Sequence, residues 1–314
     1  MPPKKKNRRS GKKNRLLVPA GIILLLLASL GAAFYFVFLR TAPPSPVEIA
    51  APAAKRAVQR ERPAPLPPPK PASSSPSKTT PATALPQVAI VIDDMGMHRE
   101  RGEQLLALDL DLTFSFLPYA PHTRALARTA ELLGRDILMH LPMEPEDTKR
   151  WDPGPGALYL TMPEAALRMH VEKNLSLVPM AIGVNNHMGS RFTADREAMR
   201  TVLALLRPRG LFFIDSLTTP ASVGCQVAAE LGLPSRRRDV FLDNIQEEAA
   251  ITRQLDQLIG VARQKGSAVA ICHPYPATVA ALAANSQRLR AAVQVVGLQQ
   301  LIERERSSVQ ALKR

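Results

Sequence analysis

Short apolar runs alternate with longer amphipathic segments along residues 87–314. Seven runs stop at polar or Gly/Pro-containing stretches: QVAIVI, LTFSFL, DILMHL, PMAIGV, GLFFI, RDVFL and SAVAIC. The segments between them have apolar residues at helical spacing and include 99–108, 121–134, 163–176, 194–207, 219–231 and 247–265. Near-continuous apolar strands that alternate with helices are typical of a parallel sheet covered by helices. The pattern therefore predicts an α/β domain, which a short run at Val293–Val296 and a final helix complete.

Polar side chains with catalytic potential follow six of the seven runs. They are Asp93 and Asp94, His140, Asn185 to His187, Asp215, Asp243, and His273. In a (β/α) barrel the carboxyl ends of all strands meet at one face, whereas an open doubly wound sheet gathers ligands near one switch point. Because the polar residues come from nearly every run, the sequence favours a seven-stranded (β/α) barrel.

A basic leader precedes this domain. Residues 1–15 contain eight basic side chains and run into the uncharged stretch 16–39. As a helix, that stretch would span about 36 Å, enough to cross the roughly 30 Å hydrocarbon layer. The apolar region of a cleaved signal peptide has only about 7–15 residues, so we favour a transmembrane signal anchor over that alternative. The charge asymmetry predicts a single-pass protein of the cytoplasmic membrane, with its amino terminus in the cytoplasm and residues 87–314 in the periplasm.

Residues 40–86 are rich in proline, lack apolar periodicity and are predicted to form a disordered linker. The net charge of +14 would by itself suggest a nucleic-acid partner. However, the first 86 residues hold 15 basic and 2 acidic side chains, while residues 87–314 hold 26 basic and 25 acidic ones. The charge therefore belongs to the leader, and we expect a membrane partner and no nucleic acid.

Two cysteines, Cys225 and Cys272, are too few for a disulfide-stapled small domain or a multi-cysteine zinc site. A periplasmic location allows a disulfide between them. Cys272 precedes His273 on a strand, so it is expected to face the helices as a packing residue. The chemistry must therefore use His, Asp and Glu.

Asp93 and Asp94 form an adjacent carboxylate pair. Neighbouring strand residues point to opposite faces, so both reach one pocket only if the chain turns, which Gly96 would ease. Two close carboxylates stay charged together only when a cation lies beside them. One carboxylate with His140 and His187, leaving a position open for water, would be a standard zinc site for hydrolysis.

Five segments within residues 88–278 carry a family resemblance: IVIDDMG, LMHLPMEP, NNHMGS, FFIDSLTT and CHPYPAT. In this order and roughly at these spacings, they resemble the divergent polysaccharide deacetylase family. The resemblance implies a seven-stranded (β/α) barrel and metal-dependent removal of acetyl groups from N-acetylated sugars. It also implies Asp93 as general base, Asp94 and His140 as metal ligands, and His273 as general acid.

The sequence departs from the family pattern at Glu144, which stands four residues after His140 where relatives have a second His. We expect His187 to replace that ligand, and Glu144 itself is the alternative. The bound metal is expected to be Zn²⁺, although another divalent ion fits the same residues. Asp215 is expected to orient His273 or to contact the substrate.

Three further residues, Asn185, Asn186 and Arg191, are expected to bind the sugar or the oxyanion. The sequence thus predicts a membrane-anchored, periplasmic deacetylase that acts on N-acetylated envelope glycans such as peptidoglycan. A glycan-binding or scaffolding protein that keeps the barrel without efficient catalysis is the alternative, and Glu144 is the feature that favours it.

Overall fold

The computed structural model describes residues 85–312 of the chain, with side chains described through residue 307. The predicted cytoplasmic tail, the transmembrane anchor and nearly all of the linker lie outside these residues. Among the helices of residues 85–312, none is both long and apolar enough to cross a membrane.

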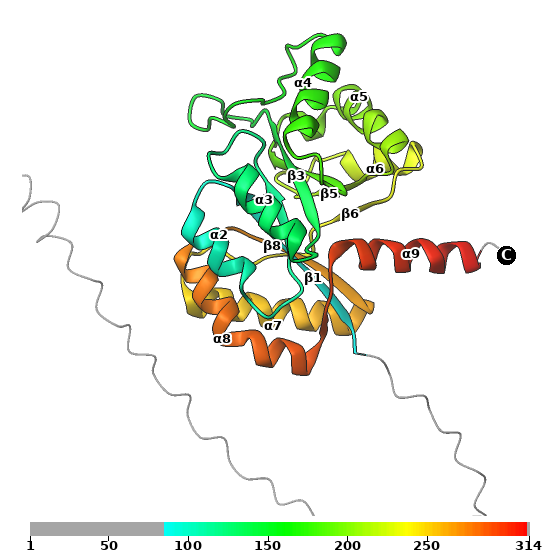
Figure 1. Ribbon diagram of the computed structural model, residues 1–314. Helices are drawn as coiled ribbons and strands as arrows, with labels where there is room; N and C mark the ends of the chain where they lie inside the picture. The colour runs from blue at the N-terminus through cyan, green and yellow to red at the C-terminus, as the bar shows by residue number, and fades with distance from the viewer. Residues whose placement is uncertain (1–84, 313–314) are drawn as a thin grey trace, which may run out of the picture. The chain divides into compact units, whose positions relative to one another are not determined.

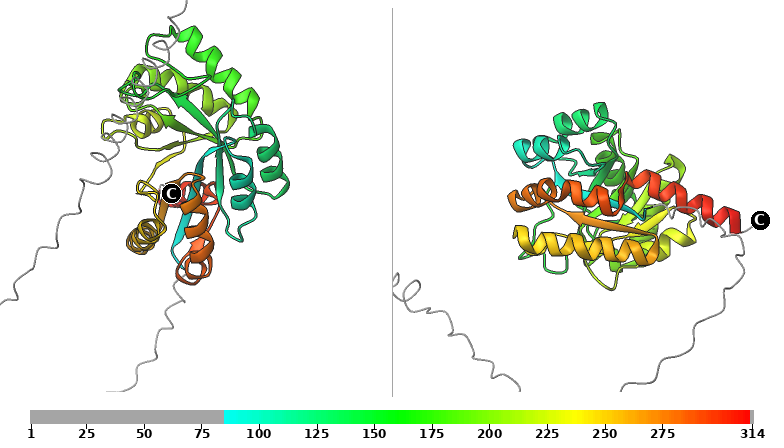
Figure 2. Two further views of the ribbon diagram at one scale, coloured as in Figure 1. Left: turned by 90° about the vertical axis from the view of Figure 1, so that its left-hand side faces the viewer. Right: turned by 90° about the horizontal axis from the view of Figure 1, so that it is seen from below.

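The described strands form one sheet in which every pair is parallel. They are β1 (Gln87–Met95), β2 (Thr113–Phe116), β3 (Ile137–Met143), β4 (Gly183–Met188), β5 (Phe212–Asp215), β6 (Ser235–Arg237), β7 (Val240–Phe241), β8 (Ser267–Cys272) and β9 (Gln294–Val295). Their order is β6-β5-β4-β3-β2-β1-β8-β7, and β9 pairs with β1. The sheet curves into a half barrel with β6 and β7 at its two ends (Figure 2).

This arrangement confirms the α/β fold and corrects the predicted seven-stranded barrel to an eight-stranded half barrel with β9 beside β1. Each of the seven predicted runs contains a strand, and β9 lies in the predicted run at Val293–Val296. The strand that the pattern missed is β6, whose sequence Ser-Arg-Arg is short, polar and partly exposed. An edge strand of this kind leaves no apolar signal in the sequence.

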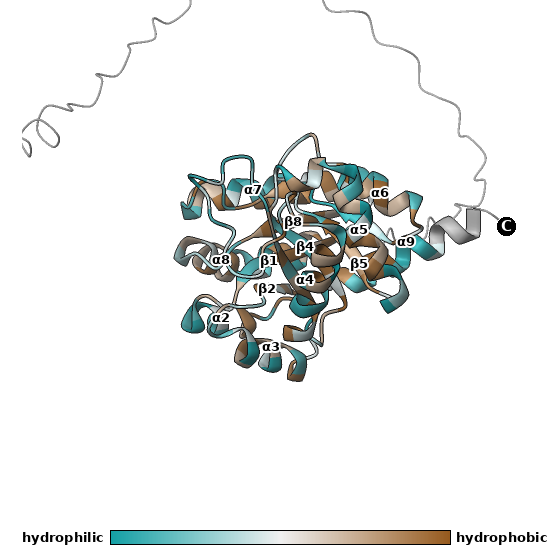
Figure 3. Cartoon of the chain, turned by 90° about the horizontal axis from the view of Figure 1, so that it is seen from above, coloured by the Kyte–Doolittle hydropathy of each residue, from teal (hydrophilic) through white to brown (hydrophobic). Residues whose placement is uncertain are grey.

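Helices cover the outside of the sheet (Figures 1 and 3). They are α2 (Arg99–Leu106), α3 (Thr123–Leu132), α4 (Glu164–Leu177), α5 (Arg196–Leu206), α6 (Gly224–Glu230), α7 (Glu248–Lys265) and α8 (Pro276–Ala292). The last helix, α9 (Leu298–Leu312), packs instead against the apolar side chains inside the half barrel. The six predicted helical segments each match one of the helices α2 to α7, and only α4 extends one residue beyond its predicted segment. Figure 3 shows that the hydrophobic sides of the surrounding helices face the strands.

Buried apolar side chains form two clusters, one on each face of the sheet. Val88 and Ile90 of β1 belong to the cluster between sheet and helices, whereas Ala89 and Val91 belong to the cluster inside the half barrel. This alternation is the two-residue period of a strand. Leu298 and Leu301 of α9 complete the inner cluster. Since the Leu298 N–H donates to Thr113 at the start of β2, α9 begins at the amino-terminal edge of the sheet.

Cys272 lies in the cluster between sheet and helices, as predicted, and burial raises the pKa of its thiol well above the ordinary value. Both Cys225 and Cys272 are free thiols, so the disulfide that the sequence allows is not formed.

We predict that Leu301→Ala lowers the free energy of unfolding by about 2–4 kcal/mol, because it leaves a cavity in the inner cluster. Leu132→Ala is the matched control, since Leu132 is 73% exposed and Leu301 only 1%. The control is expected to cost less than about 0.5 kcal/mol. Urea unfolding of the full-length chain, followed by circular dichroism, measures both; equal losses would contradict the role of α9.

Candidate metal centre

Polar side chains continue the inward-facing positions of the strands beyond the apolar layer. In β1, Ala89 and Val91 are inside, so the next inward position is Asp93. In β8, Ile271 is inside, so the next is His273. By the same period, the inward positions also include Ser115, His140, Asn185, His187 and Asp243. A polar layer therefore lies directly above the apolar interior, at the carboxyl ends of the strands.

Asp94 joins this layer by breaking the period. Its φ is +53°, and the register between β1 and β2 shifts between Ile92 and Met95. Left-handed backbone costs a non-glycine residue about 1–2 kcal/mol, and such strain is concentrated at functional sites. Gly96 lies in the same turn, and only glycine fits there, because a Cβ at this position would lie 2.1 Å from Thr123 Oγ1. The expected turn therefore begins at Asp94 itself and brings both carboxylates into one site.

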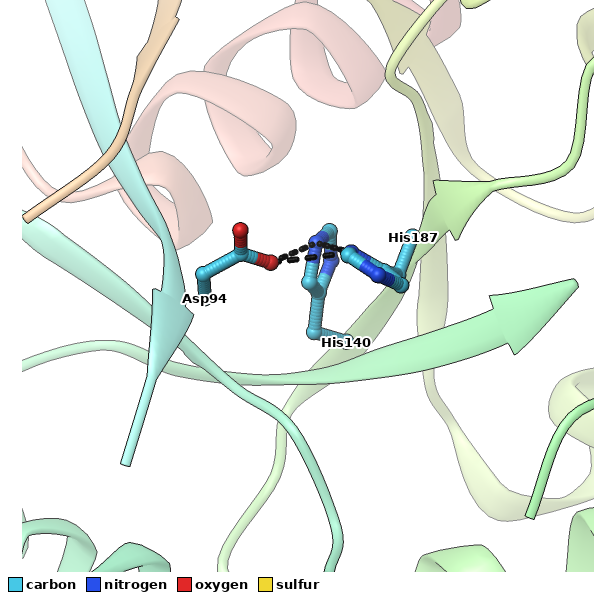
Figure 4. Close-up of side chains that lie close together, drawn as sticks. All are labelled: Asp94, His140 and His187. Carbon is cyan, nitrogen blue, oxygen red and sulfur yellow. Dashed lines mark hydrogen bonds and ion pairs between the residues drawn. The ribbon is translucent and has the colours of Figure 1, made fainter. Parts of the chain in front are cut away.

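Asp94, His140 and His187 converge, as the sequence predicts (Figure 4). Asp94 Oδ1 lies 2.8 Å from His187 Nδ1 and 3.3 Å from His140 Nε2. The two imidazole nitrogens are 3.2 Å apart. This carboxylate oxygen is buried, and the two imidazole nitrogens are its close polar neighbours, although neither meets it with normal hydrogen-bond geometry. One carboxylate and two imidazoles are a donor set that fits Zn²⁺ or a similar divalent ion.

Asn185 positions the candidate ligand His140. Asn185 Oδ1 lies 2.9 Å from His140 Nδ1, and Asn185 Nδ2 donates to Asp93 Oδ1 at 2.7 Å. The Ser115 hydroxyl also donates to Asn185 Oδ1, at 2.5 Å. If Nδ1–H of His140 is the donor to this amide oxygen, its Nε2 lone pair faces the metal position, as is usual for metal-binding histidines. Sequence analysis did not identify Ser115 as a site residue, although the alternation along β2 places it on the inward face.

The expected substrate-binding residues lie differently. Asn185 is fully buried, and its amide is used by protein partners. Asn186 accepts the Ser216 N–H and donates to Met188 O, which braces two loops. Both asparagines thus have structural partners in the protein, and their contact with a substrate stays a prediction. The side chain of Arg191 is 53% exposed and stays a candidate contact for substrate.

The two adjacent carboxylates have opposite pKa shifts. Burial raises the pKa of Asp93, and this effect exceeds the opposing attraction of His140 and His273. Burial also acts on Asp94, but the contacts with His140 and His187 outweigh it and hold its pKa far below the usual range. Asp94 is thus the permanently ionised ligand type, while Asp93 is the carboxylate suited to accept a proton.

Asp243 orients His273. Phe241 pairs with Ile271 in the sheet, so two residues further on Asp243 stands opposite His273. Asp243 Oδ1 lies 3.1 Å from His273 Nδ1. Asp243 Oδ2 accepts a hydrogen bond from the backbone N–H of His273 at 2.5 Å. Burial alone would lower the pKa of His273, but the hydrogen bond and charge of Asp243 raise it to about 9. The sequence places Asp243 among the polar residues that follow the apolar runs but gives it no specific role.

Of the two roles expected of Asp215, orienting His273 or contacting the substrate, the first is filled by Asp243. Ile214 belongs to the inner cluster, so Asp215 occupies the outward position of β5. Its carboxylate accepts the Leu217 N–H at 2.9 Å and the Ser222 hydroxyl at 2.6 Å. Asp215 shapes the loop after β5 and has no contact with the imidazole.

Glu144, the alternative ligand, anchors a loop. Its Oε2 accepts the Leu160 N–H at 2.7 Å, and its Oε1 lies 2.9 Å from Arg191 Nη1. The Glu144 N–H also donates to Leu158 O, so both ends of segment 144–160 are fastened at this residue. The structure thus brings His187 to the candidate metal position and directs Glu144 away from it.

A cavity of about 330 Å³ opens beside the convergent residues, and Asp94 and His187 lie in its lining. Its walls include Leu117–Pro121 from the loop after β2 and Asp152–Pro155 from the segment that Glu144 fastens. The rigid prolines and the Tyr119 ring give this cavity a mostly apolar surface next to the polar centre.

We predict that His187→Ala weakens zinc binding by about 10-fold or more, because it removes one of three ligands. Glu144→Gln is the matched comparison: it removes the charge of the alternative ligand, which lies outside the convergent group Asp94, His140 and His187. Zinc affinity of the full-length chain, measured by competition with a chelating dye, distinguishes the two. Loss of affinity in Glu144→Gln but not in His187→Ala would assign the ligand to Glu144.

We also predict that the His273 imidazole in chelator-treated protein titrates near pH 9, as followed by NMR. Asp243→Asn should move the midpoint down, because burial then acts without the compensating carboxylate. Asp215→Asn should leave it in place. An equal shift in both variants would refute the orienting role of Asp243.

Comparisons with known proteins identify the family of the chain. The chain is 39% identical over 223 residues to an uncharacterized protein of Haemophilus influenzae, covering 71% of this chain and 79% of the relative. It is 36% identical to the uncharacterized protein YibQ of Escherichia coli, covering 62% of this chain and 61% of YibQ. The crystal structure of uncharacterized protein ATU2773 from Agrobacterium tumefaciens is similar with a TM-score of 0.67 and 26% identity, over 70% of this chain and 90% of that one. Residues 90–302 match the sequence model of the divergent polysaccharide deacetylases, and the chain belongs to this family.

Proposed function

We propose that the protein is a metal-dependent hydrolase that removes acetyl groups from N-acetylated envelope glycans such as peptidoglycan. One observation carries the proposal: the convergent ligands Asp94, His140 and His187 lie between a carboxylate with a raised pKa and an imidazole held by a buried aspartate. Family membership supports the class of substrate and reaction.

Asp94, His140 and His187 would hold the metal, which in such sites activates water and polarises the carbonyl of the scissile amide. Asp93 is the general base, because its Oδ2 lies 3.7 Å from His140 Nε2 and its raised pKa favours proton uptake. His273 is the general acid. Its Nε2 lies 4.0 Å from Asp94 Oδ2, and a pKa of about 9 keeps it protonated at neutral pH for donation to the leaving amine.

The proposal extends to location. Residues 16–39 anchor the protein in the cytoplasmic membrane, residues 40–86 form the tether, and the domain faces the periplasm. The support is the length of the uncharged stretch and the excess of basic residues before it. The alternative function is a glycan-binding scaffold without efficient catalysis, favoured by the loss of the second motif His at Glu144.

We predict that the full-length chain, purified in detergent and loaded with zinc, releases acetate from N-acetylglucosamine oligomers or peptidoglycan fragments. Asp93→Asn should lower that rate by about 10²–10⁴-fold, because it removes the base, while zinc content stays the same. Asp256→Asn is the control, since Asp256 lies on α7 in an ion pair with Arg288.

If the zinc-loaded wild type binds these glycans but releases no acetate, the proposed enzymatic function is refuted and the glycan-binding scaffold is favoured. Failure to bind zinc would refute the proposed mechanism.

A further inference from the structure

A second groove lies on the carboxyl face of the half barrel, next to the cavity of the candidate metal centre. Its volume is about 910 Å³, and its lining includes Met97, His98, Arg101, Gln104, His122 and Pro276. Met97 also lines the cavity at the metal centre, so the two depressions adjoin. An extended ligand with one end at the metal centre would therefore reach this groove.

Three helices begin at the second groove. His98 is the residue before α2, His122 is the residue before α3, and Pro276 is the first residue of α8. None of these three amino termini receives a hydrogen bond from a capping side chain. The helices lie side by side in Figures 1 and 3. Each amino terminus carries a partial positive charge, so the three add to the positive potential of the groove.

Arg101 is the uncompensated cation of the second groove. Its neighbour Arg99 forms an ion pair with Glu103 at 2.8 Å, but the side chain of Arg101 has no ion pair or hydrogen bond among the described residues. Its Nε is buried and has no hydrogen-bond partner. A buried donor without an acceptor costs about 1–3 kcal/mol. Glu100 is the only acidic side chain among the described residues of the lining and sits at the start of α2.

The positive charge of Arg101 affects the pKa values of two neighbouring residues, His98 and Tyr275. The pKa of His98 is lowered, first by partial burial and then by the positive charge of Arg101 and by His122. Burial, Asp243 and Asp94 raise the pKa of Tyr275, whereas Arg101 opposes them. Tyr275 packs against His273 with ring centroids 5.5 Å apart. Arg101 is therefore within electrostatic reach of the residues that surround the proposed reaction.

We propose that the second groove is a subsite for a carboxylate of the substrate, with Arg101 as its principal partner. A guanidinium can bind a carboxylate through two parallel hydrogen bonds, and no described residue pairs with the guanidinium of Arg101. The substrate class is thus an acidic N-acetylated glycan, such as one that contains N-acetylmuramic acid with its lactyl carboxylate. A neutral N-acetylglucosamine polymer lacks this group. The subsite rests on the proposed function for the identity of the glycan.

The test is isothermal titration calorimetry with the full-length chain in detergent, treated with chelator so that no turnover occurs. The probes are the disaccharide N-acetylglucosaminyl-N-acetylmuramic acid and its methyl ester, which differ in one charge. We expect the wild type to bind the acid about 10-fold more tightly than the ester, with a preference that falls as salt is added. Arg101→Gln should abolish the preference, and Arg101→Lys should keep part of it. Arg128→Gln on α3, which breaks an exposed pair with Glu131, should change nothing.

Equal affinity for the acid and the ester in the wild type, or binding of neither, would overturn the subsite. The same holds if Arg101→Gln unfolds at the wild-type temperature and still prefers the acid. Because the measurement needs no catalysis, an acid preference without acetate release would keep the subsite and refute the deacetylase. Acetate release from neutral oligomers, without a preference for the acid over the ester, would support the deacetylase and refute the carboxylate subsite.

Discussion

The two-residue alternation of side chains along parallel strands is the constraint on which the rest of the structure depends. It sends Ala89 and Val91 inward to the apolar cluster, and the same count delivers Asp93 to the site. In β8 the count delivers His273 above Ile271. Because all strand pairs are parallel, these inward positions reach a common height at the carboxyl ends. Side chains of α9 complete the apolar cluster inside the half barrel, so the polar groups lie directly above a packed apolar layer.

Asp94 shows what the alternation cannot provide by itself. A regular strand would turn its carboxylate toward the helices, away from Asp93. The left-handed backbone at Asp94 and the register shift before Met95 bring it inside, at a cost of about 1–2 kcal/mol. The position gained has His140 and His187 on one side and His273 on the other. The strained backbone therefore places a second carboxylate at the same height, in a position suited to a cation.

The sequence was sufficient for the strand ends and insufficient for which side each residue faces. Seven apolar runs located seven strands and the residues Asp93, Asp94, His140, His187 and His273 that follow or end them. The choice between Asp215 and Asp243 depended on facing. Ile214 is inward, so Asp215 is outward, but no sequence signal identifies Ile214 as inward before the sheet is known. β7 has only two residues, so the sequence gives too short a pattern to show that Asp243 faces inward. The polar strand β6 had no apolar pattern at all.

The replacement of the second motif histidine follows from the same register. Pro142 pairs with His187 across β3 and β4, so His187 lies at the height of an inward β3 position just above His140. A ligand from the neighbouring strand can therefore meet the Nε2 of His140, at 3.2 Å, without help from the chain beyond Met143. That frees residue 144 for another task. The two oxygens of a carboxylate at this position accept hydrogen bonds from the Leu160 N–H and from Arg191, which fastens segment 144–160. An imidazole has no second acceptor atom and could not do both. Moving the ligand to β4 and placing Glu144 at the loop are thus two parts of one arrangement, which keeps the metal position and also fixes the wall of the adjoining cavity.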